Sequence, residues 1–352
     1  MTRRYVIGTV LLLALLAAHS CNPVEEQEQA SEPIAFSAVV AGDMPVTKAE
    51  GMIDDAGFKA AGFGVFACYT GLHTYSESSV SSDFMHNQPI SWDGERWVYD
   101  PLKFWPGEEG HHVSFFAYAP YSDGSNPCIP SFCRYQEQSD PWVLYRLADD
   151  MDDQVDLLYA TPVLDQTRPS VNTRVAFTFH HALACVGDKI TVKCSDELIA
   201  DFQDEVTAGT SDRVEILLKE MSIDYTLTAK GRLVLWNSGS ANWKSISSEE
   251  SLVRRNVVCM APSETPVRLW ASDAGSATTW TKQGLGIFCI PIESPGYAQK
   301  ATLHITCIIL RESGSESIRL ERSVTKDLLL AGIIEAEKEL EINVSLKNLV
   351  IN

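Results

Sequence analysis

Short segments of apolar or alternating residues, separated by Gly, Pro, Asp and Ser, run through most of this chain and constrain its fold more than any other feature. Apolar residues at every second position give a β-strand one buried face, and each segment has the length of a strand. Only residues 195–204 and 326–338 could form helices, and the second stretch could equally be a loop before the last strand. Many short strands with few helices predict an all-β protein built from sandwiches.

The expected strands follow one another along the whole chain after its N-terminal end. They cover residues 34–40, 63–69, 90–99, 113–119, 155–161, 175–186, 189–194, 214–225, 232–236, 267–271, 285–292, 303–311, 318–324 and 340–346. Asp93-Gly94 and Ser313-Gly314 occupy tight-turn positions and predict β-hairpins. A chain of 352 residues predicts two domains, with the boundary in the polar segment 165–173. The expected organisation is an N-terminal sandwich over residues 34–170 and a C-terminal sandwich over residues 171–352.

The N-terminal end has the features of an export signal. Arg3 and Arg4 precede an apolar run over residues 6–18, which is too short to cross a bilayer comfortably. The run leads to Cys21 in a context that resembles the processing site of bacterial lipoproteins. We therefore expect a lipoprotein signal peptide over residues 1–20 and lipidation of Cys21. The alternative is an ordinary signal peptide whose cysteine is incidental.

Residues 21–33 are acidic, contain proline and have few apolar side chains, so they cannot bury enough surface to offset the entropy of ordering. We expect a flexible tether there. Its glutamates resemble the signal that sends some lipoproteins to the outer face of the outer membrane. No later segment is long and apolar enough to span a membrane, so the expected membrane anchor is the lipid on Cys21.

The charge balance excludes some partners. The whole chain carries 28 Lys and Arg against 47 Asp and Glu, a net charge of −19. Such a surface repels nucleic acid phosphates and anionic lipid headgroups. We therefore expect no binding to nucleic acid.

Eight cysteines follow Cys21, and export would permit disulfides among them. Cys128 and Cys133 lie in a loop flanked by proline, and Cys185 and Cys194 flank a predicted turn, so these four are the candidate disulfide partners. The remaining cysteines lie inside apolar strand patterns, where a buried thiol behaves as a small hydrophobic residue. They are Cys68, Cys259, Cys289 and Cys307. The cysteine spacing has no pair typical of a zinc site, so no metal or cofactor is expected.

Four local blocks follow one another along the chain. They are Ile34-Ala35-Phe36 with Val46-Thr47-Lys48-Ala49; Trp97-Val98-Tyr99 with Phe104-Trp105-Pro106 and residues 113–121; residues 155–160 with 175–184; and Ile290-Pro291 before an alternating C-terminal strand. In order and spacing these blocks resemble those of the fimbrillin family, the pilins and accessory subunits of the type V pili of Bacteroidia. The resemblance covers nearly the whole chain after the tether. It implies two tandem β-sandwich domains of the transthyretin-like or fimbrillin-like kind.

The resemblance also implies how such a subunit assembles. In polymerising members a trypsin-like protease cuts after the basic residue of a Thr-Arg-Ala motif, the first strand leaves, and a strand of the next subunit fills the exposed groove. Here the cut would follow Lys48 and make Ala49 the new N-terminus. Lys48 stands where arginine is usual, and members that stay uncut act as anchors or terminal subunits. Stalk, tip and anchor roles are therefore all open.

Two strands have the apolar alternation that such an exchange requires. The candidate released strand presents on one face Ile34, Phe36, Ala38 and Val40. The candidate donor strand presents on one face Leu340, Ile342, Val344 and Leu346. The alternative is that both are core strands of a stable monomer. The partners implied are other pilus subunits, the outer membrane through the lipid anchor, and a host receptor or glycan.

The sequence predicts that the protein is not an enzyme. His111-His112 and His180-His181 lie in or beside predicted strands, where adjacent side chains point to opposite faces and cannot easily hold one ion. The acidic stretch 149–153 lacks the glycine and the terminal glutamate of a calcium-binding loop. Motifs of serine hydrolases, zinc peptidases and phosphate-binding loops are missing from the sequence. We therefore expect neither a catalytic site nor a metal site.

A monomeric surface lipoprotein that binds glycans or host ligands is the alternative function. Such a protein shares the lipid anchor, the tether and the tandem β-domains, and tryptophan rings can stack on sugars. Most tryptophans lie in strand or turn contexts that core packing explains equally well. Trp243 and Trp280, in polar stretches, are the candidate exposed aromatic residues. In either function the expected location is the surface of the cell outer membrane or a fimbrium.

Overall fold

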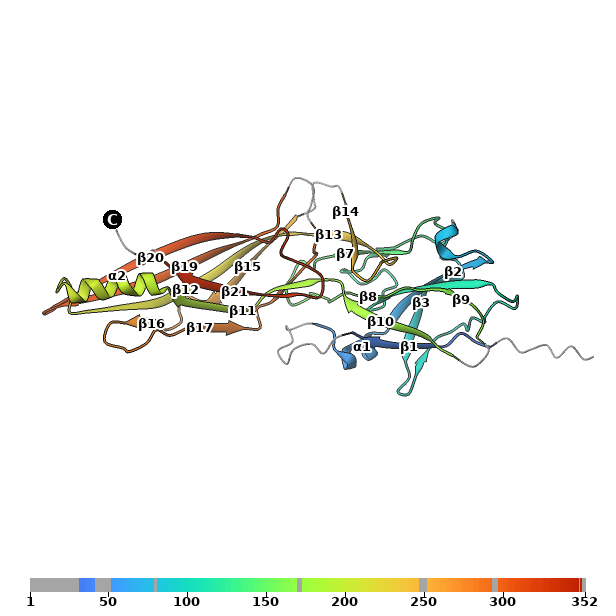
Figure 1. Cartoon of the computed structure of the whole chain (residues 1–352), viewed down its shortest axis with the longest axis horizontal. Coiled ribbons are helices and arrows are strands. Elements are labelled where there is room, and N and C mark those ends of the chain that lie inside the picture. The colour runs from blue at the N-terminus through green and yellow to red at the C-terminus, as the bar shows by residue number, and fades with distance from the viewer. Residues whose placement is uncertain are drawn as a thin grey trace, which may run out of the picture.

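The computed structural model of the chain describes residues 32–41, 52–78, 81–169, 173–246, 252–292, 297–347 and 349. Within these residues the fold is all-β, as predicted: strands predominate and only two α-helices are present. The molecule is elongated, with an N-terminal sheet at one end and a C-terminal sandwich at the other (Figure 1). The predicted signal peptide, Cys21, Lys48 and Ala49 lie outside the described residues.

The N-terminal sheet has eight strands. Their order is β1 (Phe36–Val40), β10 (Val175–His181), β8 (Leu158–Ala160), β5 (His112–Ala119), β2 (Phe63–Gly71), β3 (Met85–Trp92) and β4 (Trp97–Val98), and β9 (Val163–Gln166) also pairs with β5. The sheet ends at β1, which runs parallel to β10. The Asp93-Gly94 turn joins β3 to β4 as predicted, with Trp92 opposite Trp97.

Both faces of this sheet are buried against apolar cores. In β2, Phe63 and Val65 enter one core while Phe66 and Cys68 enter the other. Since side chains of a strand alternate between faces, a strand buried on both sides reads as one continuous apolar run. This explains why residues 113–119 are apolar on both faces of the strand except at Ser114.

The C-terminal sandwich consists of two facing sheets. One contains β17 (Trp280–Gln283), β11 (Ala184–Cys194), β18 (Ile287–Cys289) and β21 (Glu339–Leu346). The other contains β15 (Leu252–Met260), β12 (Arg213–Thr228), β16 (Val267–Ala271), β19 (Lys300–Ser313) and β20 (Glu316–Leu329). The Ser313-Gly314 hairpin between β19 and β20 is confirmed.

A smaller sheet joins the two ends of the molecule. It contains β14 (Asn242–Ser245), β13 (Lys230–Val234), β7 (Trp142–Arg146) and β6 (Ser131–Phe132). Pairing of β7 with β13 therefore brings together segments from both sides of the predicted domain boundary. The boundary itself, between residues 170 and 171, lies outside the described residues, and the strands on either side of it, β9 and β10, belong to the same N-terminal sheet.

Helix α2 (Asp196–Thr207) confirms the first helix prediction. Ser195 begins it, because the Ser195 hydroxyl accepts a hydrogen bond of 3.1 Å from the Leu198 amide. Helix α1 (Asp55–Ala61) was missed by the sequence reasoning, although Asp54 caps it in the same way. Residues 326–338 do not form a helix: β20 continues to Leu329 and turns follow.

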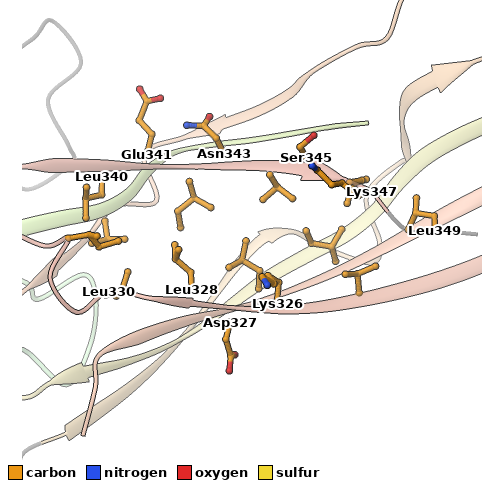
Figure 2. Close-up of a pocket in the computed structure, with 18 residues that line it drawn as sticks. Lys326, Asp327, Leu328, Leu330, Leu340, Glu341, Asn343, Ser345, Lys347 and Leu349 are labelled. Atoms are coloured by element: carbon orange, nitrogen blue, oxygen red, sulfur yellow. The ribbon is translucent and has the colours of Figure 1, made fainter. Parts of the chain in front are cut away.

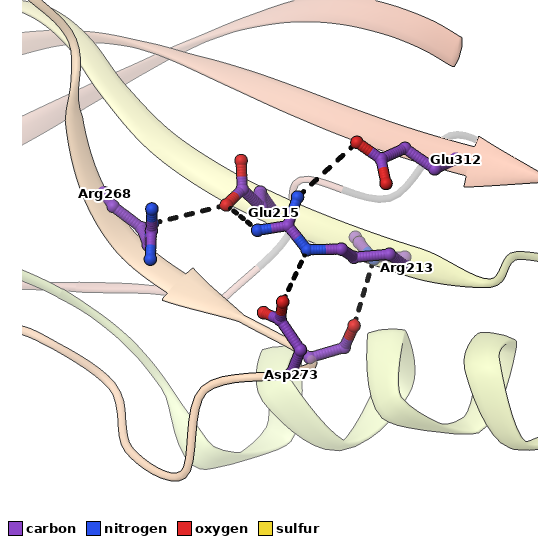
Figure 3. A network of polar contacts seen from close by, with 7 residues as sticks. Arg213, Glu215, Arg268, Asp273 and Glu312 are labelled. Atoms are coloured by element: carbon purple, nitrogen blue, oxygen red, sulfur yellow. Dashed lines mark hydrogen bonds and ion pairs between the residues drawn. The ribbon is translucent and has the colours of Figure 1, made fainter.

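The outer end of the C-terminal sandwich carries a network of ion pairs (Figure 3). Arg213 on β12 lies 2.8 Å from Asp273 and 3.5 Å from Glu312 and also contacts Glu215. Arg268 on β16 lies 3.3 Å from the same Glu215. The network joins β12, β16 and β19, and Arg213 and Arg268 share the buried carboxylate of Glu215.

Candidate strand-exchange site

Hydrogen bonds to β10 hold β1 along one edge. The residues just before β1 are hydrogen-bonded on both sides. Beyond the β10 pairing, the Val175 amide donates to Ala35 O at 2.8 Å and the Ala41 amide donates to Phe179 O at 2.7 Å. On the other side, the Ile34 amide donates to Lys103 O at 2.8 Å. No described strand pairs with the outer edge of β1 itself. An edge strand can be exchanged without breaking the rest of its sheet.

The side chains of β1 fill a core. Ile34 and Phe36 are each only 1% exposed. The Phe36 ring packs against four other rings, with centroids 5.5 to 6.4 Å apart, and these belong to Phe63, Tyr99, Phe115 and Phe177. Burial of a phenylalanine contributes about 2–3 kcal/mol of hydrophobic free energy. Ala38 and Val40 are half-buried against the same core, so all four apolar residues of this strand face one core.

The chain beyond the predicted cleavage point has attachments to the sheet in addition to its contacts with β1. The Ile53 amide donates to Asp156 Oδ2 at 3.1 Å, and His181 Nδ1 lies 2.7 Å from the same oxygen in a fully buried pair. The next residues form α1, whose Phe58 is completely buried. The Phe58 ring lies 4.8 Å from that of Phe179. Removal of β1 would thus leave α1 attached to the sheet.

The candidate donor strand is β21, at the edge of its own sheet. It runs parallel to β11, which is its one partner among the described strands. The Ser195 amide donates to Leu346 O at 2.9 Å and so holds its end. Ile342 and Leu346 are buried, whereas Leu340 and Val344 are half-buried.

An open groove of about 700 Å³ runs between β21 and the β19–β20 hairpin (Figure 2). Leu328 and Leu330 point into this groove, whereas Glu341 and Asn343 point away from it. Its apolar lining includes Leu303, Ile305, Val324, Leu328, Leu330, Leu340, Ile342 and Val344. One face of β21 is therefore incompletely covered.

The two candidate strands share one structural feature that sequence reasoning missed. β10 and β11 are consecutive strands joined by Ala182 and Leu183, and β1 lies parallel to the first while β21 lies parallel to the second. Parallel pairing between distant segments leaves no local turn signal in the sequence, so no pattern could have indicated it.

The disulfide predictions are not supported, because all eight described cysteines are free and buried. Cys185 and Cys194 lie at the two ends of β11, which places them on the order of 30 Å apart, and a disulfide needs Cα atoms within about 7 Å. Cys128 Sγ contacts Asp153 O at 3.7 Å, whereas Cys133 Sγ contacts Ser82 at 3.6 Å. Burial raises the pKa of each described cysteine thiol, to about 12 for Cys194.

The two histidines of each tandem pair contact different partners. His111 contacts Tyr69, whereas His112 Nδ1 lies 3.1 Å from His73 O. His180 Nδ1 lies 3.2 Å from Glu337, whereas His181 pairs with Asp156. Among the described residues, no group of three or more His, Cys, Asp or Glu side chains could hold a metal ion. No helix in the described part of the chain has the length and apolarity needed to cross a membrane.

The prediction that Trp243 and Trp280 are exposed is wrong. Trp243 is only 9% exposed, because it packs in the core and its Nε1 donates to Ala182 O at 2.8 Å. Trp280 is half-buried on β17. Trp236 is instead 42% exposed. The polar run that follows it, Asn237 to Ser240, was a signal that could have identified it.

Comparison with known proteins gives a consistent result. Residues 47–240, more than half of the chain, match the sequence profile of the family described as fimbrillin-like. The chain is 26% identical over 201 residues to the fimbrium subunit Fim1C of Phocaeicola vulgatus, a match that covers 54% of this chain and 49% of that protein. The matched region thus spans about half the length of this curated relative.

The fold has a counterpart among solved structures. A fimbrial protein from Bacteroides vulgatus superposes with a TM-score of 0.57 at 20% sequence identity. The superposition covers 90% of this chain and 96% of the other. The two proteins therefore share an overall fold.

Proposed function

The chain belongs to the fimbrillin-like family, and on this premise we propose that it is a subunit of cell-surface fimbriae that joins its neighbours by exchanging β-strands. The family and the fold relative are fimbrial proteins rather than enzymes. The observation that carries the proposal is the position of β1: an edge strand whose side chains fill a core and whose removal would leave the neighbouring helix in place.

Loss of β1 would leave an empty strand position that strongly favours binding of another strand. The vacated edge of β10 would expose unpaired backbone groups, and the space left by Ile34 and Phe36 would be an apolar groove. Unpaired strand edges bind extended segments through main-chain hydrogen bonds, while alternate side chains enter the groove.

The donor in this proposal is β21 of the next subunit. Its apolar residues recur at every second position, as those of β1 do, and its groove leaves one face partly uncovered. It already pairs in parallel with β11, so it could take the place of β1 beside β10 in the same direction. Release of β21 requires separation from one strand only.

Export and processing complete the proposal. We propose that residues 1–20 are removed, that Cys21 is lipidated, and that the tether 21–33 carries the subunit at the surface of the outer membrane. Cleavage after Lys48 would release β1 and begin the chain at Ala49. A chain that keeps Cys21 would be an anchor, a terminal subunit or a monomeric lipoprotein. N-terminal sequencing and intact mass of the protein from its native cell surface distinguish these states.

Strand exchange is tested with the purified chain from Asn22 onward, treated briefly with a trypsin-like protease and followed by size-exclusion chromatography. We expect oligomers to form after cleavage. Lys48→Ala should stay uncut at this position and monomeric. Ile342→Asp should be cut but stay monomeric, because a carboxylate cannot enter an apolar groove without a cost of several kcal/mol.

The matched control is Asn343→Asp, which adds the same charge to β21 on the side that points away from its groove (Figure 2). It should form oligomers as the unmodified chain does. Oligomers from Lys48→Ala, or an equal yield from Ile342→Asp, would contradict the proposal.

A further inference from the structure

Trp236 marks a second pocket, of about 370 Å³, that strand exchange does not use. The residue follows β13 and is 42% exposed. Its backbone is held on both sides: the Leu235 amide donates to Pro141 O at 2.8 Å, and Asn242 Nδ2 donates to Trp236 O at 2.8 Å. The backbone that carries this exposed tryptophan is therefore fixed beside the pocket before any ligand binds.

Polar side chains line the rest of the pocket. Gln138 and Asp140 come from the loop between β6 and β7, and Ser76 and Ser78 come from the short 3₁₀ helix η1 (Tyr75–Glu77) and its end. Tyr75 OH donates to Asp140 Oδ1 at 2.8 Å and orients this carboxylate. The pocket thus combines a carboxylate, an amide and hydroxyls with one indole face.

The loop that supplies Gln138 and Asp140 is organised by Glu137. Its carboxylate accepts hydrogen bonds from the Arg134 amide at 2.8 Å, from Ser139 Oγ at 3.2 Å and from Trp142 Nε1 at 3.2 Å. The bond from the Arg134 amide is the main cause that lowers the pKa of Glu137, so this carboxylate stays ionised near neutral pH. The loop therefore has a defined shape without a ligand.

We propose that this pocket binds a neutral carbohydrate. A sugar ring has an apolar face of C–H groups that can lie on the Trp236 indole, and hydroxyls around its edge that can donate to Asp140 and exchange hydrogen bonds with Gln138 and the serines. No lysine or arginine is among the described residues that line the pocket. An acidic sugar or a phosphate would meet the Asp140 carboxylate without a compensating cation.

The position of the pocket keeps binding separate from assembly. Tyr75, which orients Asp140, belongs to the core on one face of the N-terminal sheet, together with Phe66. Phe36 of β1 belongs to the core on the opposite face. The carbohydrate site therefore lies on the side of the N-terminal sheet opposite to the core that β1 fills, so release of β1 does not remove any residue of the core behind the site.

The test is saturation-transfer NMR on the folded chain from Asn22 onward, with lactose, mannobiose, cellobiose and N-acetyllactosamine as neutral probes. Sialyllactose serves as the acidic probe and choline as the cationic probe. We expect at least one neutral sugar to bind, and titration of that sugar should give an affinity about tenfold or more lower for Trp236→Ala. Asp140→Asn should also weaken binding, because the amide is a weaker acceptor of hydroxyl hydrogen bonds.

The matched control is Trp280→Ala, which removes an indole on β17, away from the lining of this pocket. It should bind the same sugar with unchanged affinity. The proposal is overturned if none of the four neutral sugars binds, if Trp236→Ala binds as the unmodified chain does, or if sialyllactose or choline binds more tightly than every neutral sugar.

Discussion

Phe36 and Val39 illustrate how far residues of one short strand can differ in their surroundings. Phe36 is 1% exposed and contacts four aromatic rings, whereas Val39 is 58% exposed. Alternation along β1 predicts this difference, because neighbouring side chains of a strand point to opposite faces. The identity of the four rings around Phe36 depends on strands that are distant in sequence.

Replacement of Phe36 by alanine tests this packing. Phe36→Ala should lower the free energy of unfolding by about 3–5 kcal/mol, because it removes apolar burial and leaves a cavity. Val39→Ala is the control and should change stability by less than about 0.5 kcal/mol, because Val39 is exposed. Urea denaturation followed by circular dichroism measures both. Equal effects of the two variants would mean that β1 does not fill the core as described.

At the scale of elements, β1 and β21 occupy equivalent positions. Each is an edge strand, each runs parallel to its partner, and the partners β10 and β11 follow one another in the chain. Strand β19 is instead an inner strand, because β12 and β20 are hydrogen-bonded to its two edges. Strands bonded on one edge above an open groove are expected to open more easily than strands bonded on both edges.

Hydrogen exchange measures this difference within one molecule. The amides of β21 should exchange faster than those of β19, because β21 has one partner strand and the groove leaves part of its apolar face uncovered. Mass spectrometry of peptides from the two strands gives the comparison directly. Equal protection of β21 and β19 would indicate that β21 is not ready to leave its sheet.

At the scale of the whole molecule, the two ends are joined through one apolar core. That core contains Phe66 and Phe116 of the N-terminal sheet as well as Leu303 and Ile342 of the C-terminal sandwich. The small sheet that contains β7 and β13 lies between them, and its Trp243 packs against Tyr145 with ring centroids 6.3 Å apart. The two ends are therefore not separate bodies connected by a linker.

A continuous core should make unfolding cooperative. We expect one thermal transition by calorimetry, and Trp243→Ala should shift the whole transition to lower temperature, since it removes a buried ring and its hydrogen bond to Ala182. Tyr135→Ala, at a 59% exposed aromatic residue beside the same small sheet, is the control and should shift it little. Two separate transitions, with only one of them shifted, would contradict the shared core.

Much of the architecture could be predicted from local pattern. Alternation and apolar runs identified the all-β class, most of the strands, the Asp93-Gly94 and Ser313-Gly314 hairpins, and the buried face of β1. Helix α2 was predicted over residues 195–204, whereas α1 has only seven residues and its apolar positions are too few to give a clear helical period. Local signals were reliable where a strand or cap depends on residues close in sequence.

Spacing along the chain was enough to predict most of the strands and the apolar side of β1, although β7, β9, β14 and β17 were not among the expected strands. Apart from the two hairpins, the packing of the whole molecule sets which strands pair, because pairing joins segments that no local signal connects. It placed Cys185 and Cys194 at opposite ends of β11, buried Trp243, exposed Trp236 beside Asp140, and set β1 and β21 against consecutive strands. The physical reason is that burial and contact are set by the packing of distant segments, which composition and period do not record.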